Sequence, residues 1–512
     1  MERSLSGTRL RSRPSIGALG VIFALAVCFG TAGPATAQDL SEFEKRVTLH
    51  RLDNGWTFLI YERPGAPVAS FMTLVNVGSA QEVAGITGLA HMFEHMAFKG
   101  STRVGTTDYA AEKKVLAKID AAYAAWDRER RKTGGPDEEK LAELETALEE
   151  AQKEAKQYVV SEFDETLDRE GGVGMNAFTS SDFTGYLVSL PANKAELWAY
   201  FEAERFLDPV LREFYTERDV VMEERRLRTD SQPVGRMIEQ LLAAAFVAHT
   251  YGQPTIGYMS DLQTFTREDA KEFYEKYYVP ANMVTAISGG VDADALIPIL
   301  DRYFGRFEAK PAPEPLRTRE PRQIAAREVR IPDPSQPVFA EGYLRPPQTH
   351  PDNAVYDAIG DVLSTGRTSR LYRSLVRDQK IAAQIGAFSG FPGSKYDNLM
   401  LTYAFPTPGH TAEDVRDAIR AEIERLKTEP ISDEELAMVK TRAKAGLVRT
   451  LASNFGMAQS LATYQTLYGD WRELFRSVER IDAVTKEDIL RVAGEAFRPT
   501  NRTTAMIVNE GP

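Results

Sequence analysis

Two of the six histidines in this 512-residue chain stand four residues apart, in the segment GLAHMFEHMAFKG. On a helix, His91 and His95 would lie one turn apart on the same face, with Glu94 beside them. Two imidazole nitrogens at this spacing suit a tetrahedral zinc ion, which needs at least one further protein ligand. The pattern HxxEH therefore predicts a metal site, and the alternative is a solvated polar face of a helix.

The same segment is amphipathic, which predicts the helix that would position these side chains. Four apolar residues lie on the face opposite the histidines: Leu89, Met92, Phe93 and Met96. We expect this face to be buried, because apolar residues at helical spacing pack against a core. Gly100 is expected to stop the helix.

Acidic residues in the stretch YTERDVVMEERRLR are the candidates for a third ligand. Glu217 and Glu224 are seven residues apart, which is two helical turns. They would share a stripe with Val220 and Val221, where carboxylates are costly unless a cation compensates them. Glu223 projects about 100° away from Glu224 and is the weaker candidate. The alternative is that these acids face solvent.

The surrounding elements indicate an α+β fold. The segments WTFLIYE and VASFMTLVNVG are rich in β-branched and aromatic residues, which is typical of strands. From about Thr107 to Glu162 the composition changes to Ala, Glu, Lys and Arg, interrupted by KTGGP. This change predicts a solvated hairpin of two long helices. A proline-rich, charged stretch at residues 309–323 predicts a linker.

The chain repeats itself on either side of this linker. The segment TREDAKEFYEKYYVPANMVTAISGGV begins at Thr266, and TKEDILRVAGEAFRPTNRTTAMIVNEG begins at Thr485. Thr, Glu, Asp, Pro and Asn recur between them at one offset, 485 − 266 = 219, without a gap. Two homologous halves, each ending in a helix, an X-Pro-x-Asn turn and a strand, are the simplest interpretation.

The N-terminus has the pattern of a secretory signal peptide. Four arginines precede the apolar run IGALGVIFALAVCFG, and the small residues Ala35 and Ala37 offer a cleavage site. The run is shorter than the roughly 20 residues of a membrane-spanning helix. We therefore expect residues 1–37 to be removed and the mature protein to be secreted across the inner membrane into the periplasm, without stable membrane insertion. A retained anchor is the alternative.

The mature chain would be acidic and free of cysteine. The single cysteine, Cys28, lies in the leader, so no disulfide is expected. The formal charge of −12 includes four leader arginines against Glu2, so the mature form carries −12 − 3 = −15. This charge disfavours nucleic acid as a partner.

Three motifs follow one another along the chain: GLAHMFEHMAFKGS, GGVGMNAFTSSDFTGYLVSLP and ERDVVMEE. Together they resemble the zinc-binding half of the pitrilysin and insulinase family of metallopeptidases, especially its mitochondrial-processing-peptidase-like branch. The similarity runs from about residue 46 to the C-terminus, with the charged hairpin as an insertion. The resemblance implies one zinc ion per chain, with these roles: zinc ligands His91, His95 and Glu224, general base Glu94, and supporting acid Glu217.

This ligand set implies a zinc metalloendopeptidase. Three protein ligands leave the fourth zinc position to a water molecule, whose pKa the metal lowers. Glu94 would take the proton of this water and pass it to the leaving amine.

In the family, the segment that corresponds to GMNAFTSSDFTGY forms a sheet edge onto which the substrate adds as a strand. Asn176, Ala177 and Phe178 would then hold the substrate through backbone hydrogen bonds, so unfolded peptides are the expected substrates. An ordinary interior strand is the alternative.

The second half departs from the family pattern. Family members usually carry an Arg and a Tyr there, seven residues apart, which assist at the substrate carbonyl. In SRLYRSLVRDQKIAAQIGAFSG, Val376 and Ala383 take these places, and a shift by one residue recovers Arg377 but puts Gln384 at the second place. We therefore expect a heterodimer with a second family member that supplies Arg and Tyr. The alternative is a non-cleaving, zinc-stabilised binding or scaffolding subunit.

Together these features predict two homologous α/β-sandwich halves that face each other around a chamber. Each half is expected to have a mixed, largely antiparallel sheet with helices. The predicted boundaries are: signal peptide 1–37, zinc-binding half 38–306 with the helical hairpin at about 107–162, linker 307–326, and second half without a zinc motif 327–512.

Overall fold

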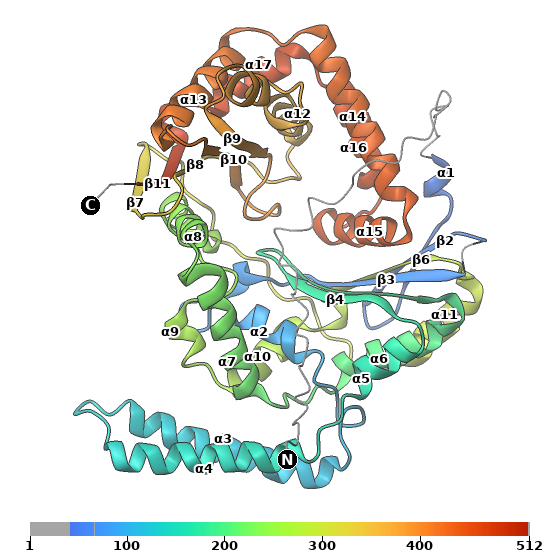
Figure 1. Ribbon diagram of the computed structural model, residues 1–512. Helices are drawn as coiled ribbons and strands as arrows, with labels where there is room; N and C mark the ends of the chain where they lie inside the picture. Colours follow the sequence, from blue (N-terminus) through green and yellow to red (C-terminus); the bar gives the residue numbers. More distant parts are fainter. Residues whose placement is uncertain (1–40, 66, 510–512) are drawn as a thin grey trace, which may run out of the picture. The chain divides into compact units, whose positions relative to one another are not determined.

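The computed structural model describes residues 41–65 and 67–509 (Figure 1). They form two α+β halves, each built on one open sheet, in agreement with the predicted fold class. The predicted signal peptide lies outside the described residues. In this part of the chain, no helix is both long enough and apolar enough to span a membrane.

The N-terminal half contains a six-stranded sheet in the order β1-β2-β6-β3-β5-β4. Its strands are β1 (Val47–Arg51), β2 (Thr57–Glu62), β3 (Val68–Val75), β4 (Val173–Thr179), β5 (Thr184–Pro191) and β6 (Met283–Gly289). Only β2 and β6 pair in parallel. The segment GMNAFTSSDFTGY is therefore a hairpin of β4 and β5 around a tight turn, and β4 is an edge strand.

The helices of this half pack mainly on one face of the sheet (Figure 1). They are α1 (Ser41–Glu44), α2 (Leu89–Met96), α3 (Tyr109–Arg130), α4 (Glu138–Lys156), α5 (Glu162–Arg169), α6 (Ala195–Leu207), α7 (Phe214–Arg225), α8 (Pro233–Ala245), α9 (Met259–Leu262), α10 (Arg267–Tyr277) and α11 (Ala293–Phe304). The core contains large aromatic side chains such as Trp56, Trp198 and Phe304, all of them buried. Because α2 and α7 rest on this core, their orientation is fixed by packing.

The C-terminal half has a five-stranded sheet in the order β7-β11-β8-β10-β9, in which only β7 and β11 are parallel. Its strands are β7 (Arg327–Pro332), β8 (Val338–Arg345), β9 (Ala382–Phe388), β10 (Asn398–Pro406) and β11 (Arg502–Val508). Its helices are α12 (Asn353–Ser364), α13 (Ala412–Thr428), α14 (Asp433–Ala452), α15 (Asn454–Tyr468), α16 (Glu473–Ala483) and α17 (Lys486–Ala496).

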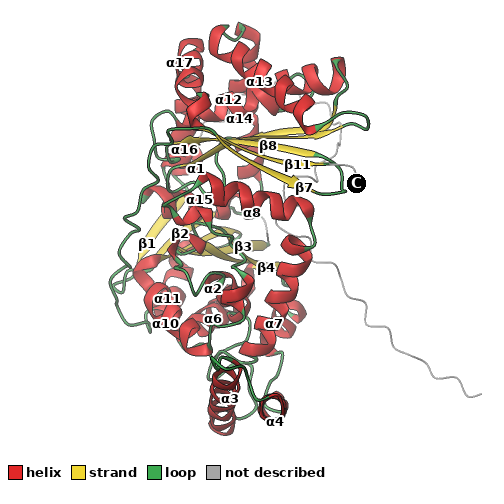
Figure 2. Ribbon diagram, turned by 90° about the vertical axis from the view of Figure 1, so that its left-hand side faces the viewer, coloured by secondary structure: helices red, strands yellow, loops and turns green. Residues whose placement is uncertain are grey.

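Each half contributes one helix to the sheet of the other half. Helix α8 packs on β7 and β11, and helix α15 packs on β3 and β6. Figure 2 shows both helices between the two sheets. Met237 and Leu241 of α8 are buried with Ala505 and Ile507 of β11, so this contact is apolar.

The repeated segments adopt the same structure in both halves. Each helix, α10 or α17, begins with a capping box formed by a Thr and the Asp three residues later. The side-chain amides of Asn282 and Asn501 donate to the carbonyls of Tyr277 and Ala496, at 2.9 Å in both cases. The repeated Thr, Asp and Asn are therefore the residues that begin and close one structural unit.

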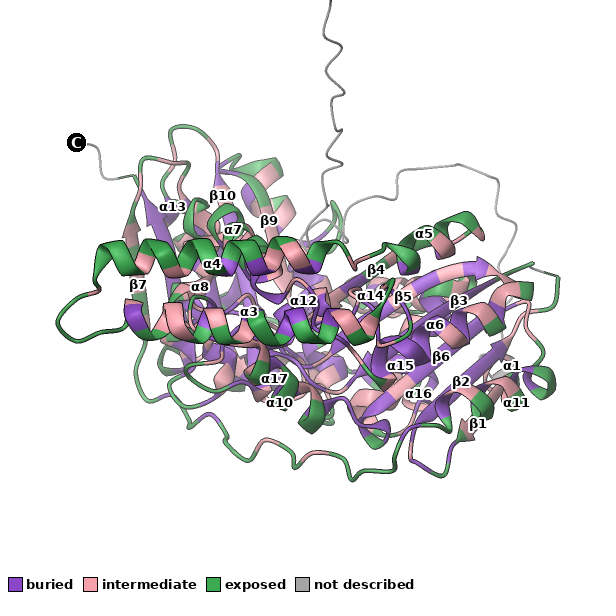
Figure 3. Ribbon diagram, turned by 90° about the horizontal axis from the view of Figure 1, so that it is seen from below, coloured by how far each residue is buried: buried purple, intermediate pink, exposed green. Residues whose placement is uncertain are grey.

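The charged hairpin of α3 and α4 packs one face against the core, whereas its outer face and its far end are exposed (Figure 3). Val115, Ile119 and Tyr123 recur every fourth residue on α3 and are buried. Glu112 and Arg212 form an ion pair in which both side chains are 1% exposed. The expectation of a solvated hairpin agrees with the outer face and was wrong for the inner face, because the charged composition conceals an apolar stripe.

The linker between the halves has no regular secondary structure but is docked against the first half. The buried carboxylate of Glu320 accepts hydrogen bonds from the backbone N–H groups of Val247, Ala248 and His249, at 2.9–3.0 Å. Three such bonds hold the linker in place at the end of α8.

Candidate metal centre

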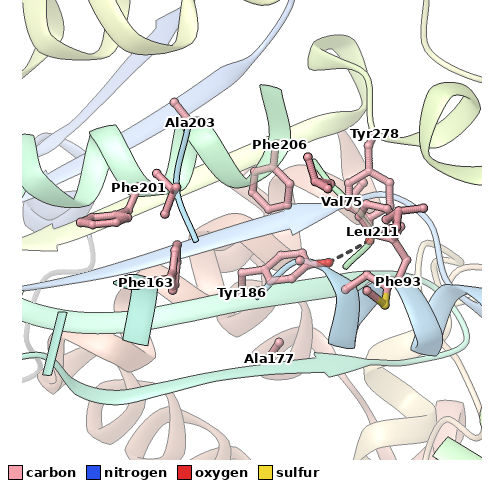
Figure 4. Close-up of a cluster of buried hydrophobic side chains, with 14 of the residues drawn as sticks. Val75, Phe93, Phe163, Ala177, Tyr186, Phe201, Ala203, Phe206, Leu211 and Tyr278 are labelled. Atoms are coloured by element: carbon pink, nitrogen blue, oxygen red, sulfur yellow. Dashed lines mark hydrogen bonds between the residues drawn. The ribbon is translucent and has the colours of Figure 1, made fainter. Parts of the chain in front are cut away.

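Helix α2 places the HxxEH residues above the core of the first half. Its four apolar residues are fully buried, as predicted, and the helix ends at Met96, one turn before Gly100. The ring of Phe93 packs against Tyr278 with ring centroids 4.3 Å apart. Tyr278 in turn shares a 2.9 Å hydrogen bond with the hydroxyl of Tyr186 in β5, and Figure 4 shows this cluster.

The structure brings together the three predicted metal-binding side chains. Nε2 of His91 and Nε2 of His95 lie 3.8 and 3.6 Å from Oε2 of Glu224 on α7. All three donor atoms lie within 4.8 Å of one another. Two imidazoles and one carboxylate that converge in this way fit a zinc ion with one open coordination position.

The stripe expected on α7 is only partly apolar. Val221 is fully buried, but Val220 is 48% exposed and does not belong to the core. Glu223 is exposed, whereas Glu217 and Glu224 are partly buried. The expectation that Val220 lies on a buried apolar stripe was wrong. The face of α7 that carries Glu217 and Glu224 is turned towards the histidines of α2, and Val220 lies beside this face, exposed to solvent.

His95 is oriented by a chain of charged residues that starts at its second ring nitrogen. Nδ1 lies 3.4 Å from Oε2 of Glu217, and the other oxygen of Glu217 accepts a 2.5 Å hydrogen bond from Nζ of Lys99. Nζ of Lys99 also donates to Glu213 at 3.0 Å. A carboxylate on the outer nitrogen of a ligating histidine fixes its ring orientation, which is the supporting role predicted for Glu217.

Glu224 has a partner of its own, which sequence reasoning missed. Arg228 lies one turn further along, in a π-helical turn (Arg226–Asp230), and forms an ion pair with Oε1 of Glu224. Oε1 is thus directed away from the histidines and Oε2 towards them. The i, i+4 spacing of Glu and Arg was the signal available in the sequence.

The carboxylate of Glu94 is held by the neighbouring edge strand. The hydroxyl of Thr179, the last residue of β4, donates to Oε2 of Glu94 at 2.6 Å. Burial raises the pKa of Glu94, and the hydrogen bond from Thr179 opposes this effect. Strand β4 and the candidate base therefore form one unit.

The two histidines differ in their electrostatic surroundings. Burial lowers the pKa of His91 to about 4, with a further contribution from His95. Burial also disfavours charge on His95, but hydrogen bonds to Glu217 and Glu224 outweigh it and raise its pKa to about 9. Burial would raise the pKa of Glu217, yet His95 and Lys99 lower it to about 2. The carboxylates of Glu217 and Glu224 thus stabilise positive charge at His95, as they would stabilise a cation at this place.

A buried carboxylate caps helix α2. Glu82 accepts hydrogen bonds from the backbone N–H groups of Gly88 and Ala90, at 2.8 and 2.7 Å. Burial raises its pKa to about 8. N–H groups in the first turn of a helix have no acceptor within the helix, so by accepting from two of them Glu82 fixes the start of the helix that carries the histidines.

The predicted substrate-binding residues lie on β4, at the edge of the sheet and beside α2. Asn176 is exposed, Ala177 is buried and Phe178 is half-buried. The register shifts between Val173 and Asn176, so the strand is irregular at its start. Within the described residues the outer edge of β4 has no strand partner, which rules out the interior-strand alternative.

In the second half, the positions expected for the assisting Arg and Tyr hold other residues. Val376 packs against the core of this half, and Ala383 is exposed on β9. Arg377 forms a two-pronged ion pair with Asp378, in which both side chains are more than half exposed. Gln384 is exposed on the edge strand.

A tyrosine from the neighbouring strand reaches this edge. The hydroxyl of Tyr403 in β10 lies 3.4 Å from Nε2 of Gln384, and its ring lies over Gly386, where any Cβ would overlap it. Alignment of this chain with the family motif tests only Ala383 and Gln384 for the tyrosine. It cannot detect the hydroxyl of Tyr403, which comes from a different strand.

Comparison with known proteins covers most of the chain. Residues 57–129 and 151–258 match the family model described as insulinase (peptidase family M16), and residues 264–443 match the model described as peptidase M16 inactive domain. The unmatched residues 130–150 fall on the far end of the helical hairpin.

Individual relatives agree with these models. The zinc protease PqqE of Helicobacter pylori is 29% identical over 441 residues, which cover 85% of this chain and 86% of that protein. A crystal structure of a protease from Helicobacter pylori has a TM-score of 0.76 at 27% identity, over 90% of this chain and 99% of that one. The first half of the periplasmic protease PqqL from Escherichia coli matches in fold, with a TM-score of 0.66 at 18% identity, over 91% of this chain and 92% of that one. The narrower resemblance to the mitochondrial-processing-peptidase-like branch stays a prediction.

Proposed function

The chain belongs to the insulinase family of peptidases, and on this premise we propose that it is a zinc-dependent endopeptidase that cleaves unfolded peptides. His91, His95 and Glu224 would hold one zinc ion. When bound, the ion would supply Lewis acidity at the scissile carbonyl and lower the pKa of water in its open position.

The observation that carries the proposal is the place of Glu94 beside the three converging donor atoms. A metal site that only stabilises a fold does not need a base there. Burial raises the pKa of Glu94 towards the neutral range in which a general base works best. Its Oε2 is held by Thr179, so Oε1 is left to accept the proton of the attacking water and deliver it to the leaving nitrogen.

Substrate would bind along β4. The unpaired backbone groups of this edge strand can accept an extended peptide as a further strand, at Asn176, Ala177 and Phe178. Such recognition depends on an extended backbone, so unfolded peptides are preferred to folded proteins. The link between Thr179 and Glu94 would place a peptide on β4 next to the base.

The proposed location is the periplasm. Two observations support it: the sequence pattern of residues 1–37, and a neighbour in fold that is described as a periplasmic protease. We further propose that the chain works with a second family member that supplies the missing Arg and Tyr. A single donor to a developing oxyanion contributes about 10² to 10³ in rate, so the chain alone should be slow.

A non-cleaving scaffolding subunit is the second candidate. It is favoured by the absence of Arg and Tyr at Val376 and Ala383 and by the match of the C-terminal half to a model described as inactive. In that case the zinc site would serve stability alone.

The test measures zinc content and turnover of an unfolded protein substrate on the same samples. Glu94→Gln should keep zinc and lose about 10²- to 10⁴-fold in turnover, whereas His91→Ala should lose both. Glu223→Gln, on the exposed face of α7, is the matched control and should change neither. Full activity in Glu94→Gln would contradict the mechanism. The chain should also be assayed alone and mixed with a relative that lacks the zinc motif and carries Arg and Tyr. If neither sample cleaves the substrate, the scaffolding subunit is favoured.

A further inference from the structure

The turn that joins β4 to β5, residues 180–183, is held in place by the C-terminal half. Its central residue, Asp182, is 2% exposed although it occupies the tip of a hairpin. The loop between β9 and β10, residues 389–397, lies directly against it. A buried carboxylate at a turn requires partners, and here they come from the other half of the chain.

Two hydrogen bonds join the two segments directly at Asp182, and two more join them through Tyr251 of the first half. The backbone N–H groups of Ser394 and Lys395 donate to Oδ2 of Asp182 at 2.6 and 3.2 Å. The hydroxyl of Tyr251 donates to Oδ1 and accepts from the N–H of Tyr396 at 3.3 Å. Charge-assisted bonds of this kind are among the stronger polar contacts in proteins.

Close packing at Gly393 excludes any larger residue from the loop. A Cβ at this position would meet the Tyr251 hydroxyl and would lie 2.8 Å from Oδ2 of Asp182. At Gly390, three residues earlier in the same loop, the nearest atom would be 3.6 Å away, which is an ordinary contact. The glycine at 393 is therefore required by the contact and the one at 390 is not.

The other side of the 180–183 turn rests on the segment that leads to the metal centre. Backbone N–H groups of Ser79 and Ala80 donate to the carbonyls of Ser180 and Ser181, at 3.2 and 2.9 Å. Two residues later in the chain is Glu82, which caps α2. On its N-terminal side the turn follows directly after Thr179, the partner of Glu94.

We propose that the 389–397 loop is a positioning element for the substrate strand. By holding Asp182, the C-terminal half fixes the position of β4. Because Thr179 of β4 binds Glu94, it also fixes the position of the Glu94 carboxylate. This assigns to the second half a role in the active centre that does not depend on an Arg and Tyr pair. The positioning residues are Asp182 in the turn, Gly393 in the loop, and Tyr251, which binds both segments. The kinetic consequence rests on the proposed peptidase activity, whereas the structural consequence does not.

Hydrogen exchange of β4 and the 180–183 turn tests the proposal on the full chain. Gly393→Ala should raise amide exchange over residues 173–187 about tenfold or more, because the turn loses its support. Gly390→Ala should match the wild type. Tyr251→Phe removes one hydroxyl without adding volume, and it should also raise amide exchange over residues 173–187. If Gly393→Ala does not fold, the result for Tyr251→Phe decides the question.

Zinc content and kinetics complete the test. The ligands lie on α2 and α7, so the positioning variants should retain zinc while kcat/KM for an extended peptide falls by about 10²-fold, the usual effect of misplacing a reacting group. The proposal is overturned if exchange over residues 173–187 stays at the wild-type rate in Tyr251→Phe and in folded Gly393→Ala. It is also overturned if exchange rises equally throughout the first half. A wild-type chain that cleaves nothing would contradict the proposed function. The exchange experiment would still decide whether the 389–397 loop positions β4.

Discussion

Replacing Glu112 with Gln should destabilise the first half through the buried ion pair at the base of the helical hairpin. Glu112 and Arg212 are both 1% exposed, and the guanidinium donates to the two carboxylate oxygens at 2.6 and 3.1 Å. Gln keeps the volume but removes the negative charge. The charge of Arg212 then stays in the core without its counter-ion.

The magnitude follows from the surroundings of Arg212. Removing one partner of a buried ion pair costs about 3 to 5 kcal/mol. Arg212 keeps three backbone carbonyl acceptors, those of Lys99, Ser101 and Val104. We therefore expect the lower end, about 3 kcal/mol. For a cooperative unit the size of one half, this lowers the melting temperature by about 6 to 12 °C.

Thermal unfolding followed by circular dichroism measures this effect, and the hairpin itself provides a matched control. Lys118 and Glu154 form an ion pair with 60% and 40% exposed side chains. Glu154→Gln should therefore cost at most about 1 kcal/mol. Equal shifts in the two variants would refute the reasoning, since they would show that burial of the charge does not decide the cost.

Three further predictions concern the metal centre and the second half. Lys99→Met should weaken zinc binding about 10- to 100-fold in a chelator competition, because Glu217 loses the cation that holds it against His95; unchanged affinity would contradict this role. Thr179→Val removes the hydrogen bond that lowers the pKa of Glu94, so the base stays protonated to higher pH and the acid limb of the kcat/KM profile should move to higher pH. A shift to lower pH would show that Thr179 does not act on the base. Asn501→Ala leaves two backbone carbonyls without their donor and should cost about 1 to 3 kcal/mol in a denaturant titration; a neutral effect would show that the repeated Asn is not structural.

Local patterns predicted the helix that carries the histidines, since its apolar face and the i, i+4 spacing depend only on helix geometry. The repeated Thr, Asp and Asn indicated two homologous halves for the same reason: they cap and close one local unit. Interactions of this kind involve residues close in the sequence, so a pattern in the sequence can reveal them.

Other features depend on contacts between distant segments. Thr179 reaches Glu94 across 85 positions, and Asp182 meets Ser394 across 212. No periodicity in one segment could indicate either pair. Val220 was misplaced because helical angle alone does not say how wide the buried stripe is.

One missed feature did have a local signal. The segment SSD in GMNAFTSSDFTGY marks a turn, and the hydroxyl of Ser180 accepts hydrogen bonds from the N–H groups of Asp182 and Phe183. Serine and aspartate in this arrangement are typical of turns. The hairpin of β4 and β5 was therefore predictable, but its clamp from the second half was not.

Zinc stoichiometry in a matched pair of α7 variants tests most directly whether this chain holds one zinc ion at His91, His95 and Glu224. Glu224 and Glu223 are adjacent acids on one helix, and only Glu224 faces His91 and His95. We predict one zinc per chain by elemental analysis in the wild type and in Glu223→Gln, and a loss of zinc in Glu224→Gln. Equal zinc content in the two variants, or a wild-type chain without zinc after reconstitution, would contradict the assignment.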